Sequence, residues 1–171
     1  MRFIGLSAVV LVACFAAQAD ADPATIWSMN AASCTPAQAA GTSYSISGGA
    51  VTNIVAHQQY FYCPIASNLR QLNGTTNTIT LYYTGQSNYG CSGLCQQAHW
   101  ISVELVAMSR SSGAETSVVT LGSTAASAFS SVSAAFSYAF DFDANVYYVR
   151  IRAEGNTTWP QTIYAVALKD S

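Results

Sequence analysis

The feature that most constrains this chain is a stretch of alternating residues between positions 134 and 154. Aromatic side chains recur at every second position in its first half, and apolar side chains recur in the same way in its second half. The alternating set is Phe136, Tyr138, Phe140, Phe142, Tyr147, Val149, Ile151 and Ala153. A period of two with aromatic and β-branched residues is typical of half-buried β-strands. The stretch therefore predicts two strands that form one wall of a β core.

The two strands are predicted to pair as a hairpin across a four-residue loop that begins at Asp143. The register has to place Phe142 opposite Tyr147, because a slip of one residue would turn one apolar set toward water. The same register places Phe140 opposite Val149.

Short strand-like segments recur along the rest of the chain at a spacing of about ten residues. They are 24–29, 44–47, 50–56, 60–65, 78–84, 101–105, 115–121 and 163–168. No segment has a convincing amphipathic helical pattern, although the Ala and Ser residues of 125–135 would allow one helical turn. The pattern predicts an all-β protein, an antiparallel β-sandwich with jelly-roll-like topology, and immunoglobulin-like strand order is the alternative.

Residues 1–19 have the pattern of a secretory signal peptide. A short positive region at Arg2 precedes an almost wholly apolar run, and Ala-Gln-Ala at 17–19 is a small-x-small cleavage site. The apolar run is too short, and ends too sharply at Asp20, for a good membrane span. Residues 20–171 are then predicted to form a single domain that is secreted or periplasmic.

Residues 11–14, Leu-Val-Ala-Cys, also resemble the lipobox of bacterial lipoproteins. In that alternative Cys14 would be acylated and would become the mature N-terminus. We favour simple cleavage, because a lipoprotein signal ending at residue 13 would be very short and apolar residues continue past Cys14.

Composition excludes some partners. Charged residues make up 8% of the chain, against about 25% in an average domain. Once Arg2 is removed with the signal, five basic residues remain against eight acidic ones, a net charge of −3. No basic patch is present, so nucleic acid is not an expected partner. Later apolar stretches are short and alternating, so no transmembrane segment is predicted after signal removal.

Four cysteines remain in the predicted mature chain: Cys34, Cys63, Cys91 and Cys95. An even number in an exported chain implies two disulfides, and four cysteines allow three connectivities. We favour Cys34–Cys63 with Cys91–Cys95, because the second pair lies in one loop around Gly93 and can close locally.

The spacing Cys91-x3-Cys95-x3-His99, with His57 as a fourth ligand, would alternatively suit a metal ion. We do not favour this interpretation, because the spacing is not that of a zinc ribbon and an oxidising compartment consumes thiolates.

A calcium site is the second alternative. Asp141-x-Asp143-x-Asn145 imitates the start of an EF-hand loop, but Val146 and Arg152 stand where that loop requires Gly and Glu. A turn that uses Asp and Asn for local backbone hydrogen bonds is favoured instead. No cofactor is therefore predicted, with calcium near Asp141 and Asp143 as the alternative.

Groups for catalysis are scarce. The mature chain has two histidines, and no Gly-x-Ser-x-Gly, His-Glu-x-x-His or phosphate-loop motif is present. A glycosidase would need two facing carboxylates, and the candidates are predicted to lie in turns or on the outward faces of strands. These candidates are Glu104, Glu115, Asp141, Asp143 and Glu154. No catalytic residue is assigned.

The excess of aromatic residues points to binding instead. The chain has ten tyrosines and three tryptophans, and flat amphipathic rings suit sugar or peptide ligands. The speculative ligand-binding residues, which face outward or lie in loops, are Trp100, Trp159, Tyr82 and Tyr148. The alternative is that these rings cap the ends of the sandwich. The two tryptophan loops, 85–99 and 155–161, would share one shallow site if they lie at the same end.

These observations predict a secreted or cell-envelope non-catalytic β-sandwich protein that binds a glycan or another extracellular partner. A structural or assembly subunit of the cell envelope is the first alternative, and a secreted hydrolase is the second.

Four short motifs carry a resemblance to known proteins. Trp27, Cys34-Thr35-Pro36, Tyr62-Cys63-Pro64-Ile65 and the Tyr-Tyr-Val-Arg-Ile strand at 147–151 are similar to those of a group of small exported bacterial β-sandwich proteins of unknown function. The resemblance covers most of the mature chain. It implies a disulfide between Cys34 and Cys63 and implies no activity, and the Cys91/Cys95 loop is an elaboration outside it.

N-terminal sequencing of the exported protein is expected to begin at Asp20 or within a few residues of it, because cleavage follows the small-x-small motif. Recovery of the protein in a detergent phase, with an acylated Cys14 as its first residue, would establish the lipobox interpretation instead.

Overall fold

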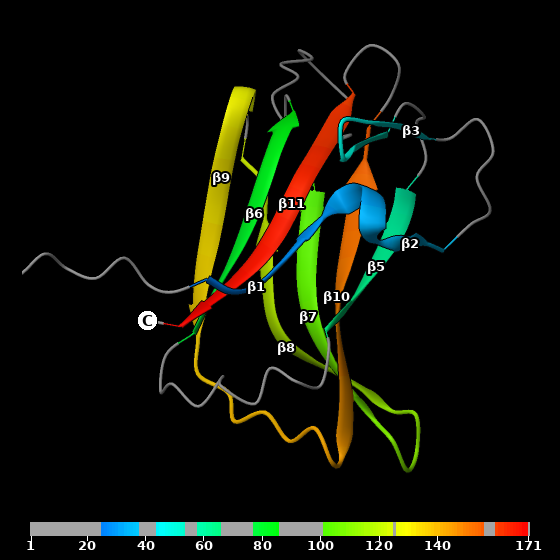
Figure 1. Cartoon of the computed structure of the whole chain (residues 1–171), viewed down its shortest axis with the longest axis vertical. Coiled ribbons are helices and arrows are strands. Elements are labelled where there is room, and N and C mark those ends of the chain that lie inside the picture. The colour runs from blue at the N-terminus through cyan, green and yellow to red at the C-terminus, as the bar shows by residue number, and fades with distance from the viewer. Residues whose placement is uncertain are drawn as a thin grey trace, which may run out of the picture.

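The computed structural model describes residues 25–37, 44–53, 58–65, 77–85, 101–124, 126–155 and 160–170. These residues form two antiparallel sheets that lie face to face (Figure 1). The predicted antiparallel β-sandwich is therefore confirmed. Within the described residues, no helix has both the length and the apolar character needed to cross a membrane.

The six-stranded sheet has the order β3-β4-β11-β6-β9, and β1 also pairs with β11. Its strands are β1 (Thr25–Asn30), β3 (Tyr44–Ser47), β4 (Ala50–Asn53), β6 (Asn77–Gly85), β9 (Ala126–Phe136) and β11 (Gln161–Asp170). A 3₁₀ turn, η1 (Ala31–Ser33), follows β1. The segment 125–135, for which one helical turn was an option, thus lies almost wholly in strand β9.

The five-stranded sheet has the order β2-β5-β10-β7-β8. Its strands are β2 (Thr35–Pro36), β5 (Gln58–Ile65), β7 (Ile101–Ser109), β8 (Glu115–Gly122) and β10 (Asn145–Glu154). β10 is the central strand and pairs with β5 on one side and with β7 on the other.

The inner faces of the two sheets form the core. Every second residue of β10 points inward, and its inner set is at most 1% exposed; it comprises Tyr147, Val149, Ile151 and Ala153. The predicted strands 78–84 and 101–105 alternate in the same way, which predicts one inward set in each. These residues are fully buried: Ile79, Leu81, Tyr83, Ile101, Val103 and Leu105. The period of two therefore places the intervening residues of each strand on an outer face.

The predicted hairpin between the two halves of the alternating stretch is wrong. β9 belongs to the six-stranded sheet and β10 to the five-stranded sheet, and residues 137–144 cross from one sheet to the other without forming a strand. The rings of Phe140 and Phe142 instead pack on the Tyr147 ring, with centroids 4.8 and 4.9 Å apart. The alternation arises because an extended crossover also needs one apolar side to close the edge of the core.

The turn before β10 is built by Asp141. Its Oδ1 accepts hydrogen bonds from the backbone N–H groups of Asp143 and Ala144, each at 3.0 Å. The backbone N–H of Asn145 donates to the Asp141 carbonyl at 3.0 Å. The predicted use of aspartate for local backbone hydrogen bonds is confirmed, although the turn begins two residues earlier than expected.

A disulfide joins Cys34, which follows η1, to Cys63 in β5. Both residues are buried, so the bond ties the segment between β1 and β2 to β5, the second strand of the five-stranded sheet. This pairing confirms the prediction. Several other predicted features lie outside the described residues: the signal peptide, Cys14, His57, Cys91, Cys95, His99, Trp100 and Trp159.

Replacing both Cys34 and Cys63 by Ala is expected to lower the free energy of unfolding by about 3.5 kcal/mol, because the bond closes a loop of about thirty residues in the unfolded chain. Urea unfolding followed by circular dichroism measures the loss. A Cys91→Ala/Cys95→Ala variant is the comparison, with an expected loss of about 2 kcal/mol for its shorter predicted ring. A loss below about 1 kcal/mol for the first variant would contradict the loop-closure argument.

Candidate functional site

The structure separates two of the predicted ligand-binding residues. Tyr82 lies on the outer face of the six-stranded sheet, between the buried residues Leu81 and Tyr83. Tyr148 lies on the outer face of the five-stranded sheet, between the buried residues Tyr147 and Val149. The two tyrosines are therefore on opposite sides of the sandwich and do not share a site.

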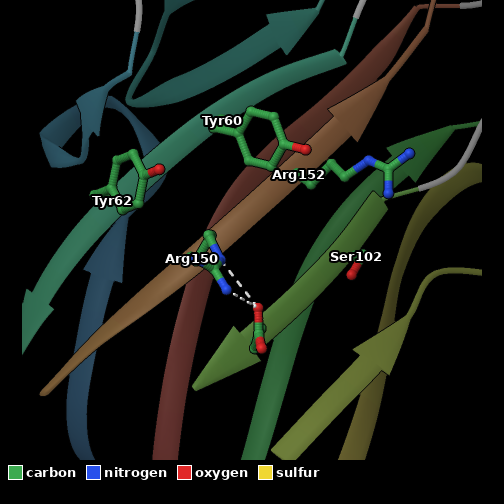
Figure 2. Close-up of a pocket in the computed structure, with 6 residues that line it drawn as sticks. Tyr60, Tyr62, Ser102, Arg150 and Arg152 are labelled. Carbon is green, nitrogen blue, oxygen red and sulfur yellow. Dashed lines mark hydrogen bonds and ion pairs between the residues drawn. The ribbon is translucent and has the colours of Figure 1, made fainter. Parts of the chain in front are cut away.

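A pocket of about 390 Å³ lies on the outer face of the five-stranded sheet (Figure 2). Three neighbouring strands line it: Tyr60 and Tyr62 from β5, Arg150 and Arg152 from β10, and Ser102 and Glu104 from β7.

The strand register explains why these six side chains meet. In one row across the sheet, Arg150 pairs with Tyr62 on one side and with Glu104 on the other. In the next row, two residues along β10, the partners of Arg152 are Tyr60 and Ser102. Residues two apart on a strand share a face, so both rows point outward together.

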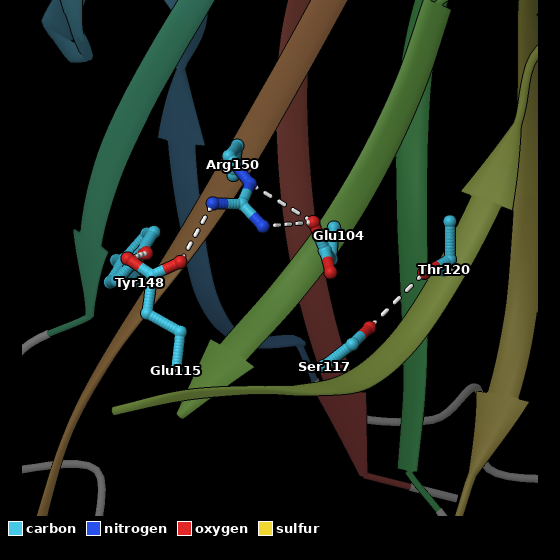
Figure 3. Close-up of polar contacts among 6 residues, drawn as sticks. All are labelled: Glu104, Glu115, Ser117, Thr120, Tyr148 and Arg150. Atoms are coloured by element: carbon cyan, nitrogen blue, oxygen red, sulfur yellow. Dashed lines mark hydrogen bonds and ion pairs between the residues drawn. The ribbon is translucent and has the colours of Figure 1, made fainter. Parts of the chain in front are cut away.

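Arg150 organises the polar part of this face (Figure 3). Its Nε and Nη2 atoms donate to Oε2 of Glu104 at 3.0 and 2.7 Å. Its Nη1 atom donates to Oε2 of Glu115 on β8 at 2.9 Å. The Tyr148 hydroxyl donates to the other oxygen of Glu115. One guanidinium group thus links three adjacent strands.

The network also sets the protonation states of its members. Partial burial alone would lower the pKa of Arg150, but its hydrogen bonds to Glu104 and Glu115 outweigh that effect and raise it. The pKa of Glu115 is lowered by the hydrogen bonds from Tyr148 and from Arg150. Burial, followed by the bond to Glu115, raises the pKa of Tyr148. At neutral pH the arginine and glutamate are therefore charged and the tyrosine is neutral.

A second ion pair flanks the pocket. Arg152 Nη2 lies 3.4 Å from Oε2 of Glu154. Taken with the Arg150 network, this face holds two arginines against three glutamates, a net charge of −1.

Of the carboxylates that had been considered for catalysis, Glu104 lines the pocket and Glu115 belongs to the Arg150 network beside it. A glycosidase needs one carboxyl group whose pKa is raised so that it can donate a proton. Glu115 has the opposite shift, and both groups accept hydrogen bonds from Arg150. The arrangement offers ring faces and fixed hydrogen-bonding groups.

The described residues form no group of three or more His, Cys, Asp or Glu side chains that could hold a metal ion. Near the turn before β10, one oxygen of Asp141 already accepts two backbone hydrogen bonds. The aspartate at the start of this EF-hand-like spacing thus serves the turn, and calcium near Asp141 and Asp143 stays the alternative to the predicted absence of a cofactor.

Sequence reasoning missed five lining residues: Tyr60, Tyr62, Ser102, Arg150 and Arg152. The alternation in each strand does predict that they face outward. The missing information was that β5 and β7 flank β10, because this neighbourhood depends on the order of strands that are distant in the sequence.

The chain was also compared with known proteins. No family model matches its sequence, and no curated protein matches it. Its structure is similar to the CBM36-1 domain, a carbohydrate-binding module of a multidomain xylanase from the hindgut metagenome of Trinervitermes trinervoides. The TM-score is 0.51 at 12% identity, over 85% of this chain and 97% of that one. A second similar structure is a carbohydrate-binding module CBM36 in complex with calcium and xylotriose, with a TM-score of 0.48 at 13% identity, over 84% of this chain and 99% of that chain.

The likeness to the CBM36-1 domain shows the fold: this chain has the β-sandwich architecture of a carbohydrate-binding module. The sequence motifs resemble those of small exported β-sandwich proteins, and of that resemblance the structure supports the β-sandwich fold and the disulfide.

Replacing Glu115 by Gln is expected to remove an acid-dependent part of the stability. The folded-state pKa of Glu115 lies below its ordinary value of 4.5, so its contribution is present above that pH and is lost as the pH falls through the folded pKa. The contribution is at most about 1 kcal/mol, because an exposed charge is screened by solvent.

Urea unfolding of both chains between about pH 7 and about pH 3 measures this effect, and the stability difference between them should shrink as the pH falls. A difference that stays constant across this range would contradict the assigned role of Glu115.

Proposed function

We propose that this chain is an exported, non-catalytic carbohydrate-binding protein and that the pocket on its five-stranded sheet binds a neutral oligosaccharide. The observation that carries the proposal is the placement of two tyrosine rings, Tyr60 and Tyr62, beside a row of fixed polar groups on β10 and β7.

The tyrosines supply the apolar contact. Sugar rings have faces of C–H groups that pack against aromatic rings, and tyrosine offers such area with few rotatable bonds. Tyr62 is held by an edge-to-face contact with Tyr148, with ring centroids 5.6 Å apart. The Tyr60 hydroxyl donates to the Gln58 side chain at 3.1 Å. Both rings are thus partly positioned before a ligand arrives.

The polar groups supply orientation. Arg150 and Glu104 are fixed by their mutual hydrogen bonds, so little side-chain entropy remains to be lost when a ligand binds. Sugar hydroxyls donate and accept hydrogen bonds, and the pocket presents guanidinium, carboxylate and hydroxyl groups from adjacent strands.

The charge of the face favours a neutral ligand. Its three glutamates outnumber its two arginines, so an acidic glycan would meet a net negative surface. The uncharged hydroxyls of a neutral oligosaccharide carry no such penalty.

The architecture and the disulfide support this proposal. The similar CBM36-1 domain is a carbohydrate-binding module of a xylanase. The Cys34–Cys63 disulfide suits an oxidising, extracellular compartment. Export agrees with the predicted signal peptide.

Isothermal titration with short β-1,4-linked xylo-, gluco- and galacto-oligosaccharides tests the pocket. Tyr62→Ala and Tyr60→Ala are each expected to weaken binding by about tenfold, because each removes one stacking surface worth up to about 1.5 kcal/mol. Ser117→Ala, on β8 outside the pocket, is the matched control and should bind as the natural chain does. Polygalacturonate should bind more weakly than any neutral ligand that binds.

Equal affinity of the two tyrosine variants and the control would contradict this location. Release of shortened products during the titration would contradict the non-catalytic assignment.

A further inference from the structure

A second aromatic cluster lies on the opposite side of the molecule. It consists of Tyr82 on β6, Phe129 on β9 and Tyr164 on β11, and we refer to these three residues as the outer aromatic patch. The rings of Tyr82 and Phe129 are nearly parallel, at 16°, with centroids 6.1 Å apart. Phe129 also contacts Tyr164 edge-on, with centroids 5.3 Å apart. β6 lies between the other two strands, so the patch extends across three adjacent strands.

Phe129 is unusually exposed. Its side chain is 63% exposed, and Ile46 is the other exposed large apolar residue of the described chain. A singly exposed apolar residue is ordinary, but Phe129 is clustered with two further rings, and contiguous exposed apolar surface is typical of interaction sites.

Irregularities on both flanking strands bring the patch together. On β11, one extra residue, Tyr164, stands between Ile163 and Ala165, which pair with adjacent residues of β6. On β9, the register shifts between Ala126 and Ser130, the interval that holds Phe129. Bulges re-aim side chains and are enriched beside functional sites. The two shifts lie on either side of Tyr83 in β6, and the rings of both flanking strands gather next to Tyr82.

The surroundings of the patch are neutral and rich in hydroxyl groups. The described strands of the six-stranded sheet carry two charged residues, Lys169 and Asp170, at the far end of β11. Hydroxyl groups lie on the sheet around the patch: Thr52 and Thr162 are partly exposed and 2.9 Å apart. Ser133 is exposed and lies 2.9 Å from the Thr80 hydroxyl, which is itself buried. A ligand for this surface should therefore have apolar ring faces, hydroxyl groups and no charge.

A second copy of the chain fits the surface less well. An aromatic side chain buries about 150–250 Å² when fully covered, and Tyr82 and Tyr164 are already half-buried. Three such rings give less than the roughly 800 Å² that each partner buries in a standard protein interface. A flat sugar chain needs a much smaller contact.

We infer that the outer aromatic patch is a second binding site, for a neutral polysaccharide laid flat across β11, β6 and β9. It is independent of the pocket on the five-stranded sheet. The two sites face opposite directions, so one molecule can hold two separate glycan chains.

Depletion binding to insoluble cellulose, chitin and xylan tests this inference. Phe129→Ala and Tyr82→Ala are each expected to weaken retention by about five- to tenfold, the loss of one stacked ring. Ile46→Ala is the matched control, because it removes an equally exposed apolar side chain from the same sheet outside the patch. Tyr62→Ala monitors the pocket separately. Unchanged circular dichroism and melting temperature confirm that each variant folds.

Three results would overturn the inference. The first is retention that neither patch substitution changes, and the second is that the natural chain is retained on none of the three polysaccharides. The third is a concentration-dependent dimer, seen by sedimentation velocity, that Phe129→Ala abolishes. Loss of short-oligosaccharide binding in Tyr62→Ala alone, with the patch substitutions still weakening retention, would support the independence of the two sites.

Discussion

The structure depends on the burial of one face of β10. Its inner residues are packed in the centre of the sandwich, and this burial fixes the register of the strand to within a single residue. Because side chains alternate along a strand, Tyr148, Arg150 and Arg152 must then point away from the core. The neighbouring strands β5 and β7 then bring tyrosine, serine and glutamate side chains to the same rows. The pocket is thus a direct consequence of how the core is packed.

The two outer faces of the sandwich differ in chemistry. The five-stranded sheet concentrates arginine and glutamate side chains in a cross-strand network, and Arg150 joins three of its strands. The described strands of the six-stranded sheet present hydroxyl groups and aromatic rings, with charge confined to one end. In a chain with so few charged residues, this segregation gives each face a distinct preference for ligands.

Strand positions and core residues could be predicted from the sequence because the period of two is a local signal. Ile79, Leu81 and Tyr83 were identified as buried from alternation alone, and the structure buries all three. The hairpin prediction failed because the same alternation in residues 137–142 serves a crossover between sheets. The pocket was missed for a related reason, since Tyr62 and Ser102 become neighbours of β10 only through long-range strand pairing. The outer aromatic patch was seen in part, through Tyr82, but the register shifts beside Phe129 and Tyr164 leave no periodic signal.

The aromatic crossover at residues 137–144 has a mechanical consequence. It is the direct covalent link between β9, which carries Phe129, and β10, which carries the pocket arginines. If ligands on opposite faces are pulled apart, this short segment is one of the covalent connections between the sheets that carry the tension. Phe140 and Phe142 clamp it onto Tyr147, and the Asp141 turn anchors it at the start of β10. The part of the load that this segment carries therefore acts on its ring packing and on the backbone hydrogen bonds of its turn.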